Sequence, residues 1–186
     1  AERAVRLDFT DGAIILSPKN ALVLAIPPSG LNAVFPHIPV PQGSHAIVNV
    51  HFRLSRPPAF ADETPILGIL GGVAEWLFLR GPIVSVTVSA ADALADLPAD
   101  EIAERVWRDI GQALDIAEAM PPYRVVKERR ATFSQTPDAM RLRPGTRTGF
   151  ANLFLAGDWT YTGLPATIES AIRSGHKAAA AILAVP

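Results

Sequence analysis

The segment from Asn152 to Ala171 constrains the fold of this chain more than any other. Its first part, Leu153 to Ala156, has the length and composition of a buried strand and ends at Gly157-Asp158. A turn of small residues follows, and a helix is predicted to open near Pro165. The first N–H groups of a helix lack internal partners and lie at the positive end of its dipole. The pattern therefore favours a loop that holds an anionic ligand, with a plain strand–turn–helix connection as the alternative.

Three stretches of the sequence share a pattern with a known family. They are Gly157 to Gly175, Gly72 to Ala90 and Val23 to Pro28, and together they are spread over the whole chain. The first closely resembles the C-terminal signature of FAD-dependent amine oxidase and phytoene-desaturase-like flavoproteins. Within that superfamily the chain most resembles the squalene-associated branch, the hydroxysqualene dehydroxylases of bacterial hopanoid synthesis. The resemblance implies a redox flavoenzyme acting on a long apolar isoprenoid.

A dinucleotide-binding motif is not found in the sequence. Flavoproteins of this kind begin with a strand, a Gly-x-Gly-x-x-Gly turn and a helix, whereas Gly68, Gly71 and Gly72 have the wrong spacing. We therefore expect this chain to be the C-terminal part of a longer enzyme that has been truncated. Whether the chain is an enzyme on its own is left open. The chain alone is predicted to be free of FAD and inactive, and to self-associate through exposed apolar surface and sheet edges.

The fold class expected is α/β, with an α+β middle: an incomplete FAD domain plus a sheet-and-helix substrate domain. Residues 1–30 are predicted to form a β-meander and a return strand of the FAD domain. Residues 31–148 are assigned to the substrate-binding domain, because alternating strands at 46–54 and 83–89 precede an amphipathic helix at 99–114. Residues 149–186 are assigned to the last strand and helix of the FAD domain.

Three segments carry further expectations about local structure. Residues 31–41 are rich in proline and are predicted to be irregular. Residues 134–148 are predicted to form a surface loop with a solvated basic cluster. The final helix is expected to pack on a sheet through a stripe of apolar and small residues, namely Ile168, Ala171, Ile172, Gly175, Ala179 and Ile182.

The cofactor site implied by the resemblance lies in the loop and the start of the last helix. Asp158 is the residue expected to contact FAD, with capping of the following turn as the alternative. Backbone N–H groups at 167–169 are expected to face the flavin, and the Glu169 side chain is expected to point elsewhere because its charge would oppose flavin reduction. The full predicted set is Gly157, Asp158, Trp159, Gly163, Leu164, Pro165, Thr167, Ile168 and Glu169.

The substrate site implied by the same resemblance involves three aromatic residues, Trp76, Phe78 and Tyr161. Ordinary packing is the alternative for each of them. The closest branch implies reductive dehydroxylation of hydroxysqualene to squalene; carotenoid desaturation, amine oxidation and a non-catalytic lipid-binding or subunit-interaction module are the other hypotheses. The residue that would protonate the departing hydroxyl cannot be named from the sequence.

Composition and charge exclude several classes of partner. A net charge of −1 and the lack of a basic stripe argue against nucleic acid. There is no cysteine, and the four histidines have no ligand spacing, so no metal site is predicted. No apolar stretch is long enough to span a bilayer. A cytoplasmic protein is expected, with peripheral contact at the inner membrane left open.

Overall fold

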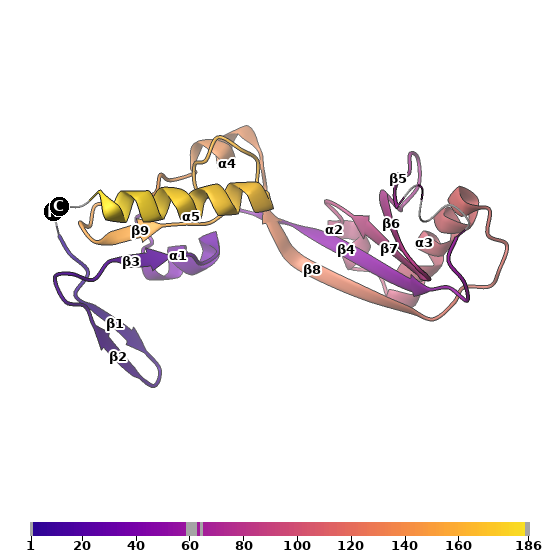
Figure 1. The fold of residues 1–186 in the computed structure, drawn as a ribbon, viewed down its shortest axis with the longest axis horizontal. Coiled ribbons are helices and arrows are strands. Elements are labelled where there is room, and N and C mark those ends of the chain that lie inside the picture. The colour runs from indigo at the N-terminus through magenta and orange to yellow at the C-terminus, as the bar shows by residue number, and fades with distance from the viewer. Residues whose placement is uncertain (1, 59–62, 64, 185–186) are drawn as a thin grey trace. The chain divides into compact units, whose positions relative to one another are not determined.

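The computed structural model describes residues 2–58, 63 and 65–184, which form two compact units. The first unit combines Ala1–Gly43 with Phe133–Pro186, and the second is Ser44–Thr132 (Figure 1). These divisions differ from the predicted ones at residues 30 and 148. The segments 31–43 and 133–148 belong to the first unit because Leu31, Val40 and Phe133 share a buried core with Leu155 and Trp159. The functional assignment of each unit stays a prediction.

The first unit is built on a short parallel pair of strands. Strand β3 (Leu22–Leu24) pairs with β9 (Leu153–Leu155), and all three residues of β9 are buried. The first two strands of the predicted meander form a hairpin, with β1 (Arg6–Phe9) antiparallel to β2 (Gly12–Ile15). Since β3 pairs with β9, the third strand leaves the hairpin and does not extend it into a meander.

Two short helices in the first unit correct the predictions of irregular structure. Helix α1 (Pro28–Val34) occupies part of the segment predicted to be irregular, and α4 (Pro137–Arg141) lies in the predicted surface loop. Each helix has a proline in its first turn. A proline there costs no hydrogen bond, because the first N–H groups of a helix have no internal acceptor. Pro137, which lies in the predicted surface loop, therefore marks a helix start, whereas the prolines of the segment 31–41 all follow the end of α1.

The last helix, α5 (Ile168–Leu183), packs through a different face from the one predicted. Its buried residues are Ser170, Ser174 and Ala178, which are spaced four apart on one narrow stripe. Five members of the predicted stripe are exposed, and Ile168 retains 82% of its accessible surface. The prediction failed because the helix meets its unit through serine hydroxyls that bond to the preceding loop, and not through its largest apolar side chains.

The second unit is a five-stranded sheet in the order β5-β6-β7-β4-β8. The strands are β4 (Ser44–Arg53), β5 (Ile66–Gly68), β6 (Trp76–Arg80), β7 (Ile83–Val88) and β8 (Tyr123–Phe133), whose last residue belongs to the first unit. The predicted helix at 99–114 is confirmed as α3 (Ala99–Leu114), and a short α2 (Asp92–Ala95) precedes it. Alternate residues of β4, β6 and β7 form one buried core with α3. The sheet therefore has one face covered by helices.

Candidate cofactor loop and substrate face

The loop between β9 and α5 begins at a glycine that no other residue could replace without strain. Gly157 has a φ of 141°, and a Cβ there would lie 2.5 Å from the Trp159 Nε1 atom. Its N–H donates to Ser174 Oγ at 2.7 Å, which ties the start of the loop to the buried face of α5. The close approach of Trp159 explains why a residue without a side chain is needed at this turn.

Trp159 is buried at the centre of the first unit. The residue is 2% exposed and its Nε1 donates to the carbonyl of Ile26 at 2.9 Å. Packing in the core thus explains why an aromatic residue stands at this position. A contact between Trp159 and the cofactor remains a prediction. Tyr161 differs, since it is 65% exposed and stays open to a ligand, with Lys177 Nζ 5.9 Å from its ring centre.

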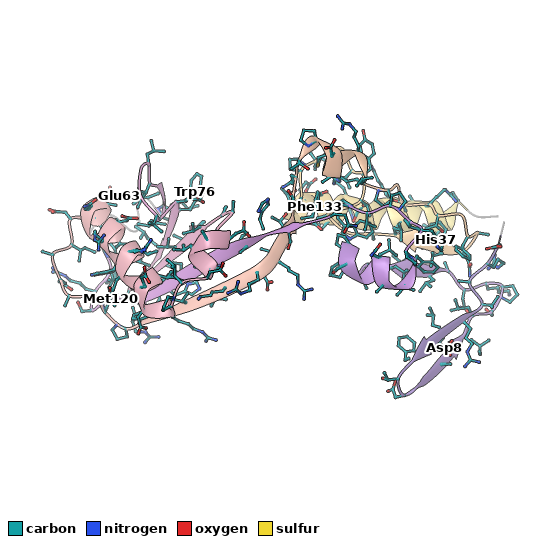
Figure 2. All side chains as sticks on the ribbon, turned by 180° about the vertical axis from the view of Figure 1, so that it is seen from behind. Asp8, His37, Glu63, Trp76, Met120 and Phe133 are labelled. Atoms are coloured by element: carbon teal, nitrogen blue, oxygen red, sulfur yellow. The ribbon has the colours of Figure 1, made fainter. Side chains whose placement is uncertain are left out.

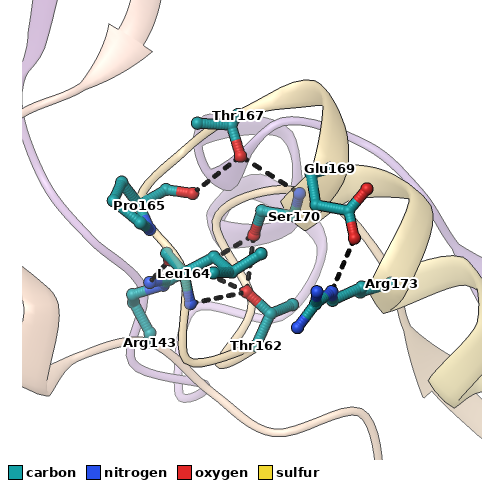
Figure 3. Close-up of polar contacts among 8 residues, drawn as sticks. All are labelled: Arg143, Thr162, Leu164, Pro165, Thr167, Glu169, Ser170 and Arg173. Atoms are coloured by element: carbon teal, nitrogen blue, oxygen red, sulfur yellow. Dashed lines mark hydrogen bonds and ion pairs between the residues drawn. The ribbon is translucent and has the colours of Figure 1, made fainter.

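Arg143 holds the whole loop from inside, although the sequence placed it in a solvated basic cluster. It is 6% exposed, and its guanidinium donates to the carbonyls of Asp158, Thr160 and Leu164 at 2.6–2.7 Å. Its longer contacts reach the hydroxyls of Thr162 and Ser170 at 3.4 Å (Figure 3). One side chain therefore gathers carbonyls from three points of the loop. Its neighbours in sequence, Leu142 and Pro144, gave no signal of this role.

The charge of Arg143 is buried among carbonyl dipoles. Burial lowers the pKa of its guanidinium from the ordinary value, while the nearby charge of Asp158 works in the opposite direction. Arginine remains protonated in proteins despite such a shift. The guanidinium of Arg143 therefore places a fixed positive charge beside the backbone of the loop. A positive charge there favours binding of an anionic group.

Helix α5 begins at a capped N-terminus, and among the described residues no hydrogen bond engages the N–H groups of its first two residues. Thr167 is the N-cap residue, and its Oγ1 accepts from the Ser170 N–H at 3.1 Å. Ile168 and Glu169 follow as the first helical residues, so their N–H groups have no acceptor within the helix. The Glu169 carboxylate accepts from Arg173 Nε at 2.7 Å (Figure 3). This exposed ion pair turns the carboxylate along the helix surface, and contact of the backbone N–H groups with the cofactor stays a prediction.

The middle of the loop presents small and open positions. Gly163 has a φ of 86° and no atom within 4 Å of a Cβ built on it. The carbonyl of Pro165 accepts from Thr167 Oγ1 at 3.3 Å, and Leu164 is fixed through its carbonyl by Arg143. Together, a glycine with space around it, free helix donors and a buried cation fit the pyrophosphate-bearing, anionic character of FAD.

Trp76 and Phe78 lie on the sheet of the second unit, on the face opposite α3. Leu77 and Leu79 are buried in the core, while Trp76 and Phe78 are 50% and 41% exposed. Figure 2 labels Trp76 among the side chains of the second unit. Phe78 pairs with Ile66 of β5, which is also exposed. These three side chains form an apolar patch of the kind that receives a hydrophobic ligand.

Comparison with known proteins defines the class to which this fold and loop belong. Residues 1–183 match the family described as flavin containing amine oxidoreductase, so the chain belongs to that family. This agrees with the resemblance in the sequence and with the α/β fold.

Individual proteins that are similar to this chain carry more specific names than the family does. A hydroxysqualene dehydroxylase from Sinorhizobium fredii is 49% identical over 96% of this chain and 42% of that protein. One from Rhodopseudomonas palustris is 45% identical over 94% of the chain and 41% of that protein. A zeta-carotene desaturase from Synechocystis is more distant, at 30% identity over 56% of the chain and 22% of that protein. The chain thus spans about two-fifths of the length of the dehydroxylases it matches.

A solved structure supports the fold alone. It comes from Exiguobacterium sp. 255-15 and provisionally carries the name protoporphyrinogen oxidase, with a TM-score of 0.71 and 12% identity. The match covers 96% of this chain and 44% of that one. Among the described residues, no helix is long and apolar enough to cross a membrane, and no three His, Asp or Glu side chains gather as a metal site would need.

Proposed function

We propose that this chain is part of an FAD-dependent oxidoreductase that removes the hydroxyl group of hydroxysqualene reductively and yields squalene. The observation that carries the proposal is the 42–49% identity to three hydroxysqualene dehydroxylases over 93–96% of the chain. The desaturase relatives align with a smaller share of the chain and at lower identity. Carotenoid desaturation is therefore the weaker alternative.

The loop before α5 supports binding of FAD in the first unit. Backbone N–H groups of Ile168 and Glu169 would face the flavin, Gly157 and Gly163 would let it approach the backbone, and Asp158 would contact it. Buried Arg143 keeps the loop in this shape. When bound and reduced, FAD would supply the hydride for this reaction.

The uncovered sheet face of the second unit supports binding of the isoprenoid. Trp76 and Phe78 would contact the hydrocarbon and exclude water from it. An exposed apolar patch on a chain of this size also suits contact with a membrane surface, from which a water-insoluble substrate is drawn, or self-association of the chain. A cytoplasmic enzyme that works at the membrane surface is consistent with all of these features.

The experiment compares the chain of residues 1–186 with the complete gene product, each incubated with FAD. We expect the complete product to be yellow and, with a chemical reductant, to convert hydroxysqualene to squalene in an assay by gas chromatography and mass spectrometry. The chain alone is expected to be colourless and inactive. A complete product that binds no flavin, or that desaturates phytoene and leaves hydroxysqualene unchanged, would overturn the proposal.

A further inference from the structure

Three arginines lie at one end of the uncovered face of the sheet in the second unit. They are Arg53 on β4, Arg80 on β6 and Arg124 on β8, and all three are exposed. The residues next to them in each strand pack into the core. Because successive side chains of a strand point to opposite faces, the arginines point away from the core.

The register of the sheet groups these arginines around Ile83 of β7. Ile83 is paired with Arg53 on one neighbouring strand and with Arg80 on the other. Adjacent strands lie about 4.8 Å apart, so long arginine side chains on β4 and β6 can reach the same anion. Arg53 and Arg124, together with Ile83 and His51, also line a shallow hollow of about 260 Å³.

The charges of these three arginines are not balanced by acidic groups. Among the described residues, no hydrogen bond or ion pair engages the guanidinium groups of Arg53, Arg80 and Arg124. No Asp or Glu of the described chain lines the hollow. Positive charges without counter-charges raise the local concentration of anions.

Other charged groups of the same unit have partners within the protein. Arg129 of β8 forms an ion pair with Asp96 at 2.7 Å, on the side of the sheet that the helices cover. The Glu128 carboxylate accepts from the backbone N–H of Arg130 at 3.1 Å. The contrast indicates that the end of the sheet around Ile83 is suited to an anion from outside the chain.

The arginines adjoin the apolar patch on the same face of the sheet. Phe78 and Arg80 are two residues apart on β6, so their side chains lie on one face about 7 Å apart along the strand. The register continues the patch from Phe78 to Ile66 of β5. The uncovered face therefore has an apolar region next to a cationic region.

We propose that this face binds an amphiphile with a phosphate or diphosphate group, which Arg53, Arg80 and Arg124 bind while the hydrocarbon chain lies on the apolar patch. Guanidinium groups bind phosphate through paired, charge-assisted hydrogen bonds. Hydroxysqualene carries no anionic group, so this ligand belongs to a different class from the proposed substrate. The inference goes beyond the proposed function and does not depend on it.

Both parts of the ligand contribute to binding on an open face of this kind. Water and salt screen the attraction between exposed arginines and a free anion, which makes that attraction weak. A hydrocarbon chain adds the free energy of removing apolar surface from water. A molecule with both groups should therefore bind more tightly than a molecule with either group alone.

The test is isothermal titration calorimetry of the complete gene product with three probes: geranyl diphosphate, geraniol and inorganic diphosphate. Geranyl diphosphate should bind most tightly, and its affinity should fall as the salt concentration rises. Arg53→Gln, Arg80→Gln and Arg124→Gln should each weaken its binding about tenfold, the equivalent of one charged hydrogen bond.

Two further variants serve as controls. Arg108 of α3 is also exposed and has no partner among the described residues, so Arg108→Gln makes the same change of charge and should leave the affinity unchanged. Phe78→Ala should weaken the binding of geranyl diphosphate and not that of inorganic diphosphate.

Each outcome supports or overturns the inference. Weaker binding in the variants of Arg53, Arg80 and Arg124, with unchanged binding in Arg108→Gln, supports it. Equal effects of all four arginine variants, or inorganic diphosphate bound as tightly as geranyl diphosphate, would overturn it. Binding to phosphatidylglycerol vesicles without affinity for geranyl diphosphate would make the face a membrane contact and would also overturn it.

Discussion

The loop before α5 and the sheet of the second unit are stabilised by different kinds of contact. The sheet is held by apolar packing, in which Val50, Phe52 and Val86 lie fully buried under the helices. The loop has one buried apolar side chain, Trp159, and its backbone is held by polar contacts, since Arg143 and Ser174 bind backbone groups of the loop from buried positions. Apolar packing tolerates many sequences of similar volume, whereas polar anchoring requires particular atoms at particular places. The loop is therefore the part of the molecule whose shape depends on single residues.

The largest effect should come from removing the centre of the apolar core. Phe52 is fully buried and packs on Trp107 with ring centres 5.2 Å apart. Phe52→Ala should destabilise the second unit by about 3–5 kcal/mol, because it leaves a cavity. Hydrogen-exchange mass spectrometry of peptides from residues 44–58 and 76–90 measures the change.

Phe78→Ala is the matched control for this substitution, because Phe78 lies on the uncovered face of the same sheet. We expect a loss of less than about 1 kcal/mol there, since an exposed side chain leaves no cavity. Equal losses for the two variants would contradict the division of the sheet into a packed face and an open face.

Removing the polar anchor of the loop should have the next largest effect. Arg143→Met retains much of the side-chain volume but leaves the carbonyls of Asp158, Thr160 and Leu164 without their donor. We expect a loss of about 2–4 kcal/mol in the first unit, since buried acceptors would lose charged partners. Faster hydrogen exchange in peptides covering residues 153–172 would report it.

Arg141→Met serves as the comparison for that prediction. Arg141 is exposed and forms a surface ion pair with Asp138. Loss of this ion pair in Arg141→Met should change the free energy of unfolding by less than about 1 kcal/mol.

Arg143→Lys should restore the stability of the loop poorly, because one ammonium group does not reproduce the planar fork of donors of a guanidinium. Full rescue by lysine would show that charge alone holds the loop.

The cap of α5 should contribute less. Thr167→Ala removes the acceptor for the Ser170 N–H and should cost about 1 kcal/mol. Thr167→Ser keeps the hydroxyl and should retain most of the stability. Thermal unfolding of the two variants beside the wild type measures the difference. If both variants behaved alike, the hydroxyl would not be the stabilising group.

The smallest predicted effect concerns acid stability in the second unit. The hydrogen bond to His45, and then the one from the Ala46 N–H, lower the pKa of Asp92 below its usual range. A carboxyl whose pKa is lower in the folded state stabilises the fold above its unfolded pKa. That contribution is lost as the pH falls through the folded-state value. Asp92→Asn should therefore reduce the loss of stability between about pH 5 and pH 2 in urea unfolding. An unchanged acid profile would contradict it.

The two regions also differ in how far the sequence predicts their structure. Alternating residues at 83–89 and the apolar periodicity at 99–114 determine a strand and a helix locally, and both are confirmed as β7 and α3. Burial of Arg143 depends on carbonyls 15–21 residues further along the chain. No periodic pattern encodes a contact of that kind. For the same reason the buried face of α5, with Ser170 and Ser174, was not predicted.

The site itself was predictable in part. The glycines at 157 and 163 have the positive φ angles that a loop of this kind needs. The start of α5 was placed near Pro165, whereas the cap is at Thr167. Contact of these residues with FAD, and of Trp76, Phe78 and Tyr161 with substrate, stays a prediction.

The backbone N–H groups at the start of α5 are proposed to bind the flavin, and one substitution tests this contact directly. Ile168→Pro removes the N–H of the first helical residue, a position where proline is tolerated, and Thr167 is already extended as a residue before proline requires. Ile168→Ala retains the N–H and is the control. In the complete gene product, titration with FAD should show binding about tenfold weaker for Ile168→Pro, the equivalent of one hydrogen bond, and unchanged for Ile168→Ala. Equal affinity of the proline variant and the wild type would contradict the claim.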